Sequence, residues 1–186
     1  ITYAYDASNR LIGVTTQLTV TDGQATDRFT ETVRYSYDGL GRRTTTDGGT
    51  GVVSYLYTDR RVIEERDQTD ALLASYVGGL RMERGGTISY YQADGGGSIR
   101  ALADQSGNVT ERVDYGPFGT PAFSGGGDES ALANPYLFGS SRYDVDVGLY
   151  VYGGRRHDPS TARYLQRGPE SFANPYTFAG NNPLRR

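Results

Sequence analysis

The sequence predicts an all-β protein of antiparallel hairpins and meanders with little helix. Its 186 residues include 16 tyrosines and 26 glycines. Tyrosine favours the half-buried surface of a sheet, whereas glycine is unfavourable inside a helix and supplies turns. Tyrosines also recur two residues apart, which is the side-chain period of a strand, and Asp-Gly and Asn-Pro pairs separate the apolar segments as turns do.

The first repeated unit is a tyrosine-rich strand followed by an aspartate turn. It occurs twice at an offset of 32 residues, as Tyr3, Tyr5, Asp6 and Asn9 and then as Tyr35, Tyr37, Asp38 and Gly41. The two tyrosines of each copy share one face of the strand, and we expect both pairs to be buried. The aspartate can accept hydrogen bonds from backbone N–H groups further along and so start a turn. Asn9 and Gly41 should complete it with positive φ, since asparagine and glycine adopt that conformation most easily.

Looser copies continue the pattern along the chain. They lie at residues 54–57, which keep the tyrosine pair, and at 67–70 and 104–107, which keep the aspartate and a permissive fourth residue. We expect positive φ at Gly107 for this reason. Apolar residues alternate over 12–20 and again over 29–37, and Asp22-Gly23 between them predicts a hairpin turn. Repeats of this kind predict stacked units that share one core.

A glycine-rich, polar stretch at residues 124–133 divides the chain into two types of sequence. We interpret it as a surface loop between a repeat region, residues 1–123, and a region of aromatic and proline phrases, residues 134–186. We expect neither region to fold independently, because neither can close a sheet alone. Ile1 in place of an initiator methionine indicates that the sequence is cut from a longer chain.

The second region repeats a phrase in which Asn-Pro precedes two aromatic residues. Its copies begin forty residues apart, at Asn134 and Asn174. Together with the phrases between and after them, they supply the motif residues Tyr136, Phe138, Tyr143, Asp144, Gly148, Tyr150, Asp158, Pro159, Tyr176, Phe178, Asn182 and Pro183. Proline restricts the preceding residue to extended backbone and has no N–H, so each Asn-Pro marks a turn before a strand. We expect the aromatic residues of these strands to pack in a core.

In their order and spacing these phrases resemble the core domain that closes bacterial Rhs and YD-repeat proteins, and the tyrosine-aspartate units resemble the YD repeat itself. The resemblance implies a β-cocoon, a hollow shell of the polymorphic-toxin type that is secreted or attached to the cell envelope. Such a shell encloses a C-terminal effector or toxin and helps to deliver it. The implied partners are the rest of a longer chain, the effector and the secretion machinery. The alternative is a secreted or cell-surface adhesion or filament protein whose tyrosine-rich sheets contact glycans.

Composition excludes several other classes of function. With no lysine, the chain has no P-loop and no Schiff-base residue, and with no cysteine and one histidine it has no zinc site of the usual kind. A net charge of −3 without a basic block argues against nucleic-acid binding. No apolar run approaches the ~20 residues of a membrane helix. Asp144 and Asp146 supply only two carboxylates, fewer ligands than calcium needs, and make a poor calcium site. We therefore assign no cofactor and no metal.

One catalytic hypothesis follows from the resemblance. Many Rhs proteins release their C-terminal toxin by a self-cleavage that resembles aspartyl-protease chemistry, in which two carboxyl groups share a proton. The first acid of the family pair falls on Gly168 here, and the second would follow Pro183. Because Asp158 has an adequate role in a turn, we assign no catalytic residue. We interpret His157 as a packing residue, since the family has an aromatic residue there. Ala162 replaces a family glycine and should avoid positive φ or accept a strain of ~1 to 2 kcal/mol.

Overall fold

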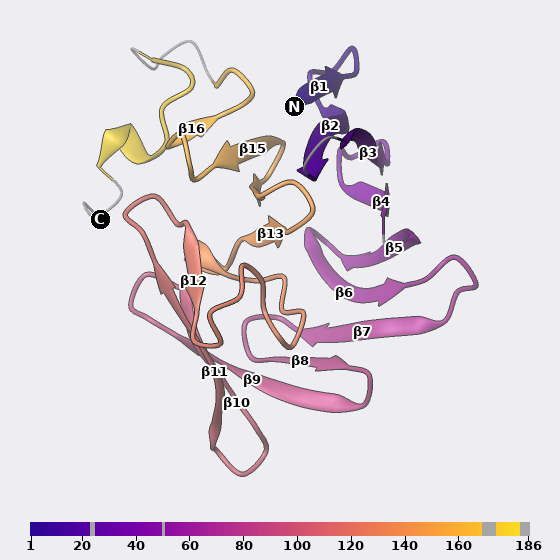
Figure 1. Cartoon of the computed structure of the whole chain (residues 1–186). Coiled ribbons are helices and arrows are strands. Elements are labelled where there is room, and N and C mark those ends of the chain that lie inside the picture. The colour runs from indigo at the N-terminus through magenta and orange to yellow at the C-terminus, as the bar shows by residue number, and fades with distance from the viewer. Residues whose placement is uncertain (23–24, 50, 169–173, 183–186) are drawn as a thin grey trace. The chain divides into compact units, whose positions relative to one another are not determined.

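Short strands follow one another along the chain, several of them with tyrosines two residues apart, and Figure 1 shows strands and turns with few helical residues. The computed structural model describes residues 1–22, 25–49, 51–168 and 174–182, with the backbone alone for 18–22 and 25–29. Its chain divides into two compact units, Ile1–Leu72 and Leu73–Arg186. Each unit has its own buried residues.

The first unit is a meander in which each strand pairs antiparallel with the next along the chain. Its strands are β1 (Thr2–Tyr5), β2 (Leu11–Asp22), β3 (Ala25–Tyr37), β4 (Arg43–Gly48), β5 (Gly51–Thr58) and β6 (Arg61–Arg66). Asp22 pairs with Ala25 at the end of the β2–β3 hairpin, where the turn was predicted; Gly23 itself lies outside the described residues.

One face of this meander is buried. Val33 is 6% exposed and Tyr35 is 4% exposed, while Tyr37 is half-buried, as the two-residue period predicts. Tyr5, in contrast, is 37% exposed, so the prediction of a buried pair at Tyr3 and Tyr5 is wrong. The physical reason is that β1 has a paired strand, β2, on one side only among the described residues.

The second unit contains two antiparallel sheets. The first consists of β7 (Leu72–Val77), β8 (Arg81–Arg84), β9 (Thr87–Ala93), β10 (Ile99–Ala103), β11 (Val109–Tyr115) and β12 (Pro121–Phe123), paired in chain order. The second consists of β13 (Arg142–Asp144), β14 (Leu149–Tyr152), β15 (Arg155–Asp158) and β16 (Arg163–Tyr164), again in chain order. Isolated bridges join Tyr136 to Arg142 and Arg163 to Thr177.

The two sheets of the second unit share a core. Val113 and Phe123, from β11 and β12, pack with Leu137 and with Tyr150 of β14, and all four are less than a tenth exposed. Two short 3-10 turns, η1 (Phe138–Ser140) and η2 (Ala179–Asn181), are the only helical elements in the described part of the chain. The predicted all-β fold with little helix is therefore confirmed. Over the same residues, no helix has the length and apolarity needed to cross a membrane.

Candidate functional site: turn clasps and a buried aromatic core

Five aspartates build the same five-residue loop at the ends of hairpins. In each loop, Oδ1 accepts hydrogen bonds from the N–H groups two and four residues later at 2.8–3.0 Å, and the residue three positions later has positive φ. The aspartates are Asp6, Asp38, Asp67, Asp94 and Asp104. Positive φ at Asn9, Gly41 and Gly107 confirms the turn prediction. Sequence reasoning missed the loop at Asp94, although Gly97 three residues later has the same spacing.

The loop hydrogen bonds favour the ionised carboxylates. At Asp6, the N–H of Arg10 contributes most to a pKa below the ordinary value. At Asp38, the guanidinium of Arg42 contributes most to the same downward shift in pKa. In both loops burial opposes the shift without reversing it. Both aspartates are therefore fixed acceptors that hold a turn.

An arginine at the end of the first loop links that loop to the next one. Nε of Arg10 donates to Oδ2 of Asp6 at 2.7 Å, and its Nη1 donates to the carbonyl oxygen of Asp38 at 3.3 Å. The same guanidinium lies 4.9 Å from the centroid of the Tyr37 ring. The Tyr37 hydroxyl donates to the carbonyl oxygen of Leu11 at 2.5 Å. We call this set of loop aspartate, arginine and neighbouring tyrosine a turn clasp.

A second turn clasp repeats the arrangement at the next hairpin. Nε of Arg42 donates to Asp38 at 2.7 Å, and its Nη1 donates to the carbonyl oxygen of Asp59 at 2.7 Å. Its guanidinium lies 5.1 Å from the Tyr57 ring, whose hydroxyl donates to the carbonyl oxygen of Arg43 at 2.8 Å. Hydrogen bonds from the charged guanidinium to fixed acceptors and its cation–π contact with the ring both favour a single orientation of the arginine side chain. The tyrosine-aspartate repeat thus joins neighbouring hairpins, and each of these tyrosines lies at a shift of strand register.

A related clasp occurs in the second unit. Nε of Arg100 lies 3.0 Å from Oδ2 of Asp94, and the guanidinium lies 5.2 Å from the ring of Tyr115. The hydroxyl of Tyr115 donates to the carbonyl oxygen of Ile99 at 2.6 Å. This clasp therefore uses the same three chemical groups at a different spacing, since Arg100 lies six residues after Asp94.

His157 lies at the centre of the aromatic core of the second unit and is fully buried. Its ring stacks on Phe178 with centroids 3.8 Å apart. Nε2 lies 2.8 Å from the carbonyl oxygen of Phe118 and Nδ1 lies 3.3 Å from that of Arg163. Burial lowers the pKa of His157, and the two carbonyl groups offset this only in part. The predicted packing role is confirmed, and the ring joins three separate segments.

The β11–β12 turn is inserted into the same core. The buried hydroxyl of Tyr150 donates to the carbonyl oxygen of Gly119 at 2.7 Å. Gly119 has φ of 95°, and a Cβ there would lie 2.8 Å from Cδ1 of Phe138. Glycine is therefore required both by the backbone and by the approach of the ring. Removal from water raises the pKa of Tyr150 strongly, so its hydroxyl stays protonated and donates.

The Asn-Pro phrases form side-chain-capped turns, and the prediction that each leads into a strand is wrong. Oδ1 of Asn134 accepts from the N–H of Tyr136 at 3.0 Å, and Oδ1 of Asn174 accepts from that of Tyr176 at 3.0 Å. Each asparagine side chain thus accepts a hydrogen bond from a backbone N–H group that would otherwise pair with a neighbouring strand. Tyr176 is 41% exposed, which also corrects its assignment to the core, whereas Phe178 is 7% exposed.

The remaining motif residues lie in the second sheet and its turns. Tyr143 packs on Tyr150 with ring centroids 4.7 Å apart. Gly148, with φ of 68°, closes the β13–β14 turn by donating to the carbonyl oxygen of Asp144 at 2.8 Å. The N–H of Asn182 donates to the carbonyl oxygen of Ala179. Pro183 lies outside the described residues.

At the position of the family acid, Gly168 is closely surrounded. A Cβ on this residue would lie 2.7 Å from Nη1 of Arg155 and 2.9 Å from the carbonyl oxygen of Pro175. The guanidinium of Arg155 lies 3.7 Å from the centroid of the Tyr164 ring. The N–H of Gly168 donates to the carbonyl oxygen of Pro175 at 2.8 Å. The Cβ of an acidic side chain would collide with the Arg155 guanidinium and with the main-chain oxygen of Pro175. The space that the family acid would need is therefore already occupied.

Asp158 has the turn role expected of it. Its Oδ1 accepts from the N–H and the hydroxyl of Ser160 at 2.8 and 2.6 Å, and its Oδ2 accepts from the hydroxyl of Thr161 at 2.9 Å. Although burial acts to raise it, these hydrogen bonds hold the pKa of Asp158 below its ordinary value. Ala162, in the same β15–β16 connection, has φ of 59° and therefore accepts the predicted strain.

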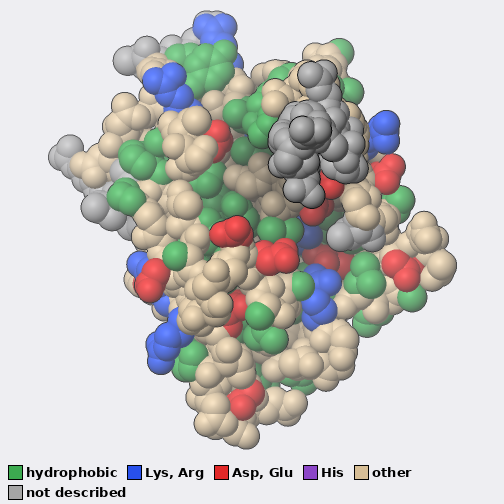
Figure 2. All heavy atoms as spheres, viewed as in Figure 1, with side chains coloured by type: hydrophobic (Ala, Val, Ile, Leu, Met, Phe, Trp, Pro, Cys, Tyr) green, Lys and Arg blue, Asp and Glu red, His purple; other side chains and the backbone are tan. Residues whose placement is uncertain are grey.

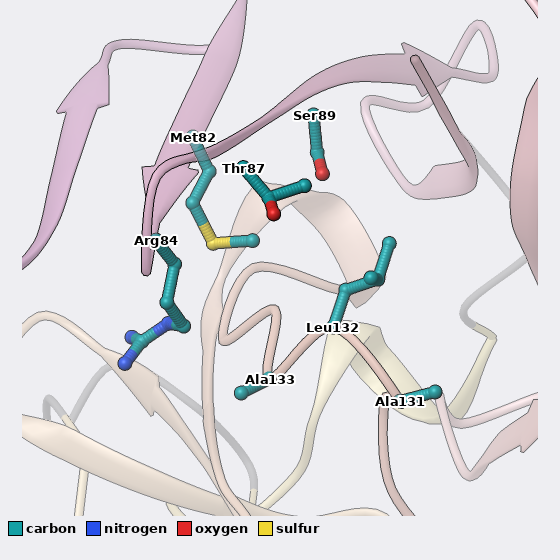
Figure 3. Close-up of a pocket in the computed structure, with 7 residues that line it drawn as sticks. All are labelled: Met82, Arg84, Thr87, Ser89, Ala131, Leu132 and Ala133. Carbon is teal, nitrogen blue, oxygen red and sulfur yellow. The ribbon is translucent and has the colours of Figure 1, made fainter.

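A pocket of about 240 Å³ lies between two strands and a loop of the second unit. It is lined by Met82, Arg84, Thr87, Ser89, Ala131, Leu132 and Ala133 (Figure 3). Its single charged side chain, Arg84, points away from Met82 in Figure 3 and donates to the Tyr76 hydroxyl at 3.0 Å. The lining therefore contains no acid-base pair. The described residues also contain no group of three or more histidine, aspartate or glutamate side chains that could hold a metal ion.

Charge on the surface is mixed. On the face shown in Figure 2, arginine and acidic side chains lie in small, interspersed groups. The ion pairs of the described residues include Arg66 with Glu64, both in β6, at 2.6 Å.

Comparison with known proteins places these features in a family. A family model described as Teneurin YD-shell matches residues 17–184. The tRNA3(Ser)-specific nuclease WapA of Bacillus spizizenii is 26% identical over 197 residues, covering 98% of this chain and 8% of the relative. Teneurin-3 of Danio rerio is 26% identical over 177 residues, covering 83% of this chain and 6% of the relative.

A solved structure shows the same fold. The Tc holotoxin pore of Photorhabdus luminescens contains a chain that superposes with a TM-score of 0.72 at 21% identity, covering 98% of this chain and 10% of that one. The present chain therefore spans about a tenth or less of the length of these proteins.

Proposed function

Because this chain belongs to the teneurin YD-shell family of Rhs/YD-repeat proteins, we propose that it forms part of the wall of a shell that encloses a C-terminal effector. The resemblance drawn from the sequence is confirmed, and the role of the chain is structural. The finer proposal is that the shell surrounds an effector or toxin supplied by the longer chain and helps to deliver it. We also propose that the protein is secreted or attached to the cell envelope.

The turn clasps carry the structural part of the proposal. Asp6, Asp38, Arg10 and Arg42 are engaged in joining one hairpin to the next, at distances of 2.7–3.3 Å. In the second unit, His157 and its aromatic neighbours are likewise engaged in packing. Side chains that could perform chemistry elsewhere therefore hold the wall together here.

The effector part of the proposal is supported by the names and lengths of relatives. WapA is named as a nuclease, and the present chain matches only 8% of it. We propose that the catalytic segment lies elsewhere in the longer chain and that residues 1–123 and 134–186 contribute wall and closing region, respectively. These two regions depend on each other for folding, with the glycine-rich stretch 124–133 between them.

The test is protease protection in the full-length protein. We expect the segment that follows this region to resist digestion while the wall is intact and to be digested after the wall is unfolded with urea. In the absence of urea, the shell region itself should also resist digestion. Equal digestion of the following segment in intact and unfolded protein would reject enclosure while leaving the wall role in place.

A further inference from the structure

Two of the five aspartate loops contain an Asp-Gly pair. The pairs are Asp38–Gly39 and Asp94–Gly95, whereas the other three loops have alanine or glutamine after the aspartate. Neither Gly39 nor Gly95 has positive φ, and no atom lies within 4 Å of a Cβ built on either residue. The loop therefore accepts a side chain at this position, and neither the turn nor its packing requires glycine.

Asp-Gly is the dipeptide in which aspartate isomerises most readily, because glycine has no side chain to hinder attack by its own nitrogen. That nitrogen bonds to Cγ of the aspartate, and its proton leaves with the carboxyl hydroxyl as water, which closes a five-membered succinimide. Water then opens the ring at one of its two carbonyl groups and gives either aspartate or isoaspartate. The reaction needs no oxidant and no cofactor. It does need a protonated carboxyl group whose Cγ can reach the glycine nitrogen.

The first loop holds Asp38 in a state that opposes this reaction. Its Oδ1 accepts from the N–H groups of Leu40 and Arg42 at 2.9 Å, and its Oδ2 accepts from Nε of Arg42 at 2.7 Å. The carboxylate is therefore bound to groups beyond the glycine. The bond from the Arg42 side chain also contributes most to a pKa below the ordinary value. A carboxylate that stays ionised and fixed is a poor target for the glycine nitrogen.

Asp94 is held in the same way in the second unit. Its Oδ1 accepts from the N–H groups of Gly96 and Ser98 at 2.9 and 3.0 Å, and its Oδ2 lies 3.0 Å from Nε of Arg100. The side chain of Arg100 is 44% exposed, compared with 29% for Arg42. Because a more exposed ion pair is weaker, we expect less protection at Asp94 than at Asp38.

The two other Asp-Gly pairs of the sequence do not belong to aspartate loops. Asp47 lies in β4 and pairs with Arg34 on one side and Val52 on the other. Gly23, in the pair Asp22-Gly23, lies outside the described residues. A clasp arginine therefore acts on the pairs at Asp38 and Asp94.

We propose that Asp38 and Asp94 are sites of isoaspartate formation that the turn clasps keep closed in the folded protein. Isoaspartate lengthens the main chain by one carbon and moves the carboxylate, so the modified loop loses its acceptor for the N–H groups. At position 38 this also removes the bond that directs Arg42 to the carbonyl oxygen of Asp59, which it reaches at 2.7 Å. Modification of the β3–β4 turn therefore releases its contact with the β5–β6 turn.

The test measures isoaspartate by peptide mapping after long incubation of the folded protein at neutral pH. An isoaspartyl peptide keeps its mass, elutes separately and resists an endoprotease that cuts at aspartate. A parallel sample in urea gives the rate without protection. We expect Asp38 and Asp94 to react at least about tenfold more slowly in the folded protein, because the loop must open before the reaction can occur.

Two arginine variants test the clasps separately. Arg42→Leu should raise the rate at Asp38 about fivefold or more and leave the rate at Asp94 within about twofold, since only one clasp is lost. Arg100→Leu should have the reverse effect, and it tests the proposal in the other unit if Arg42→Leu does not fold. Gly39→Ala added to Arg42→Leu is the matched control. It keeps the loop and hinders the attack, so isoaspartate at position 38 should fall to the level of the unchanged protein or below.

Three outcomes would overturn the proposal. Equal rates at Asp38 in folded protein and in urea would show that the loop gives no protection. An unchanged rate at Asp38 in Arg42→Leu, or at Asp94 in Arg100→Leu, would show that the arginine does not control the reaction. Equal acceleration at both aspartates in either variant would assign the effect to general unfolding. None of these readouts depends on an enclosed effector, so this proposal and the proposal of enclosure can fail separately.

Discussion

The imidazole of His157 lies flat on the phenyl ring of Phe178, with the ring planes inclined by 16°. Phe178 belongs to the described segment 174–182, which is joined to β16 by the bridge between Arg163 and Thr177. This stacked pair therefore attaches the end of the described chain to the second sheet. Its stability depends on the charge of a buried imidazole.

We expect acid to weaken this attachment. The pKa of His157 in the folded protein lies below 6.5, chiefly because of burial, so the unfolded chain binds the proton more readily. The stability contribution is complete above about pH 6.5 and is lost as the pH falls toward the folded-state pKa. One proton can contribute at most about 1.4 kcal/mol per pH unit. Urea unfolding at pH 7.5 and 5.5 measures the loss, and His157→Phe should reduce it. An unchanged pH dependence in that variant would contradict the assignment.

Removal of one clasp arginine should destabilise the first unit. Arg42→Leu removes the contacts with Asp38, Asp59 and Tyr57, and we expect a loss of about 1–2 kcal/mol in the free energy of unfolding. Arg42→Lys should lose less because it keeps the charge. Arg60 is exposed and serves as the control, since Arg60→Leu should change stability by less than about 0.5 kcal/mol. Equal effects at positions 42 and 60 would argue against the clasp.

A methyl group at Gly119 should be poorly tolerated. It would approach Phe138 within 2.8 Å at a backbone φ of 95°, so strain and overpacking act together. We expect Gly119→Ala to lower the free energy of unfolding by about 2–4 kcal/mol. Gly95→Ala is the matched control, because no atom lies within 4 Å of its Cβ position. Thermal or urea unfolding distinguishes the two, and a neutral Gly119→Ala would refute the close approach.

Relief of backbone strain at Ala162 should stabilise the protein. A φ of 59° costs an alanine about 1–2 kcal/mol. Glycine avoids this strain, but part of the gain is offset because glycine has greater conformational freedom in the unfolded chain. We expect Ala162→Gly to raise the free energy of unfolding by about 0.5–1 kcal/mol. The same change at Ala122 in strand β12 should lower it, as glycine does in a strand.

We expect the longer chain not to cleave itself. Aspartyl chemistry needs two carboxyl groups around one water, and Gly168 supplies none. The measurement is the mass of purified protein extended past Arg186, which should remain intact. Gly168→Asp should reduce stability without restoring cleavage, since the side chain meets Arg155 and Pro175. A cut after Pro183 that is abolished by Asp158→Asn and kept in Glu170→Gln would instead identify Asp158 as catalytic.

Local chemistry made part of the structure predictable from the sequence. The loops at Asp6, Asp38 and Asp104 depend on hydrogen bonds within five residues, so spacing alone predicted their φ values. The fold class followed from the two-residue tyrosine period. The sequence also showed that glycine replaces the family acid at position 168, because the order of the motifs is enough to identify that position.

Tertiary structure decided the contacts between segments that are distant in sequence. Nothing near Arg10 in the chain indicates that it lies over Tyr37, because strand register brings them together. In the same way, only packing shows that Arg155 fills the space beside Gly168. Tyr176 is exposed despite its aromatic motif, since capping by Asn174 makes a turn where a strand was expected. Hydrogen bonds over a few residues are encoded locally, whereas burial depends on which other segments cover a side chain.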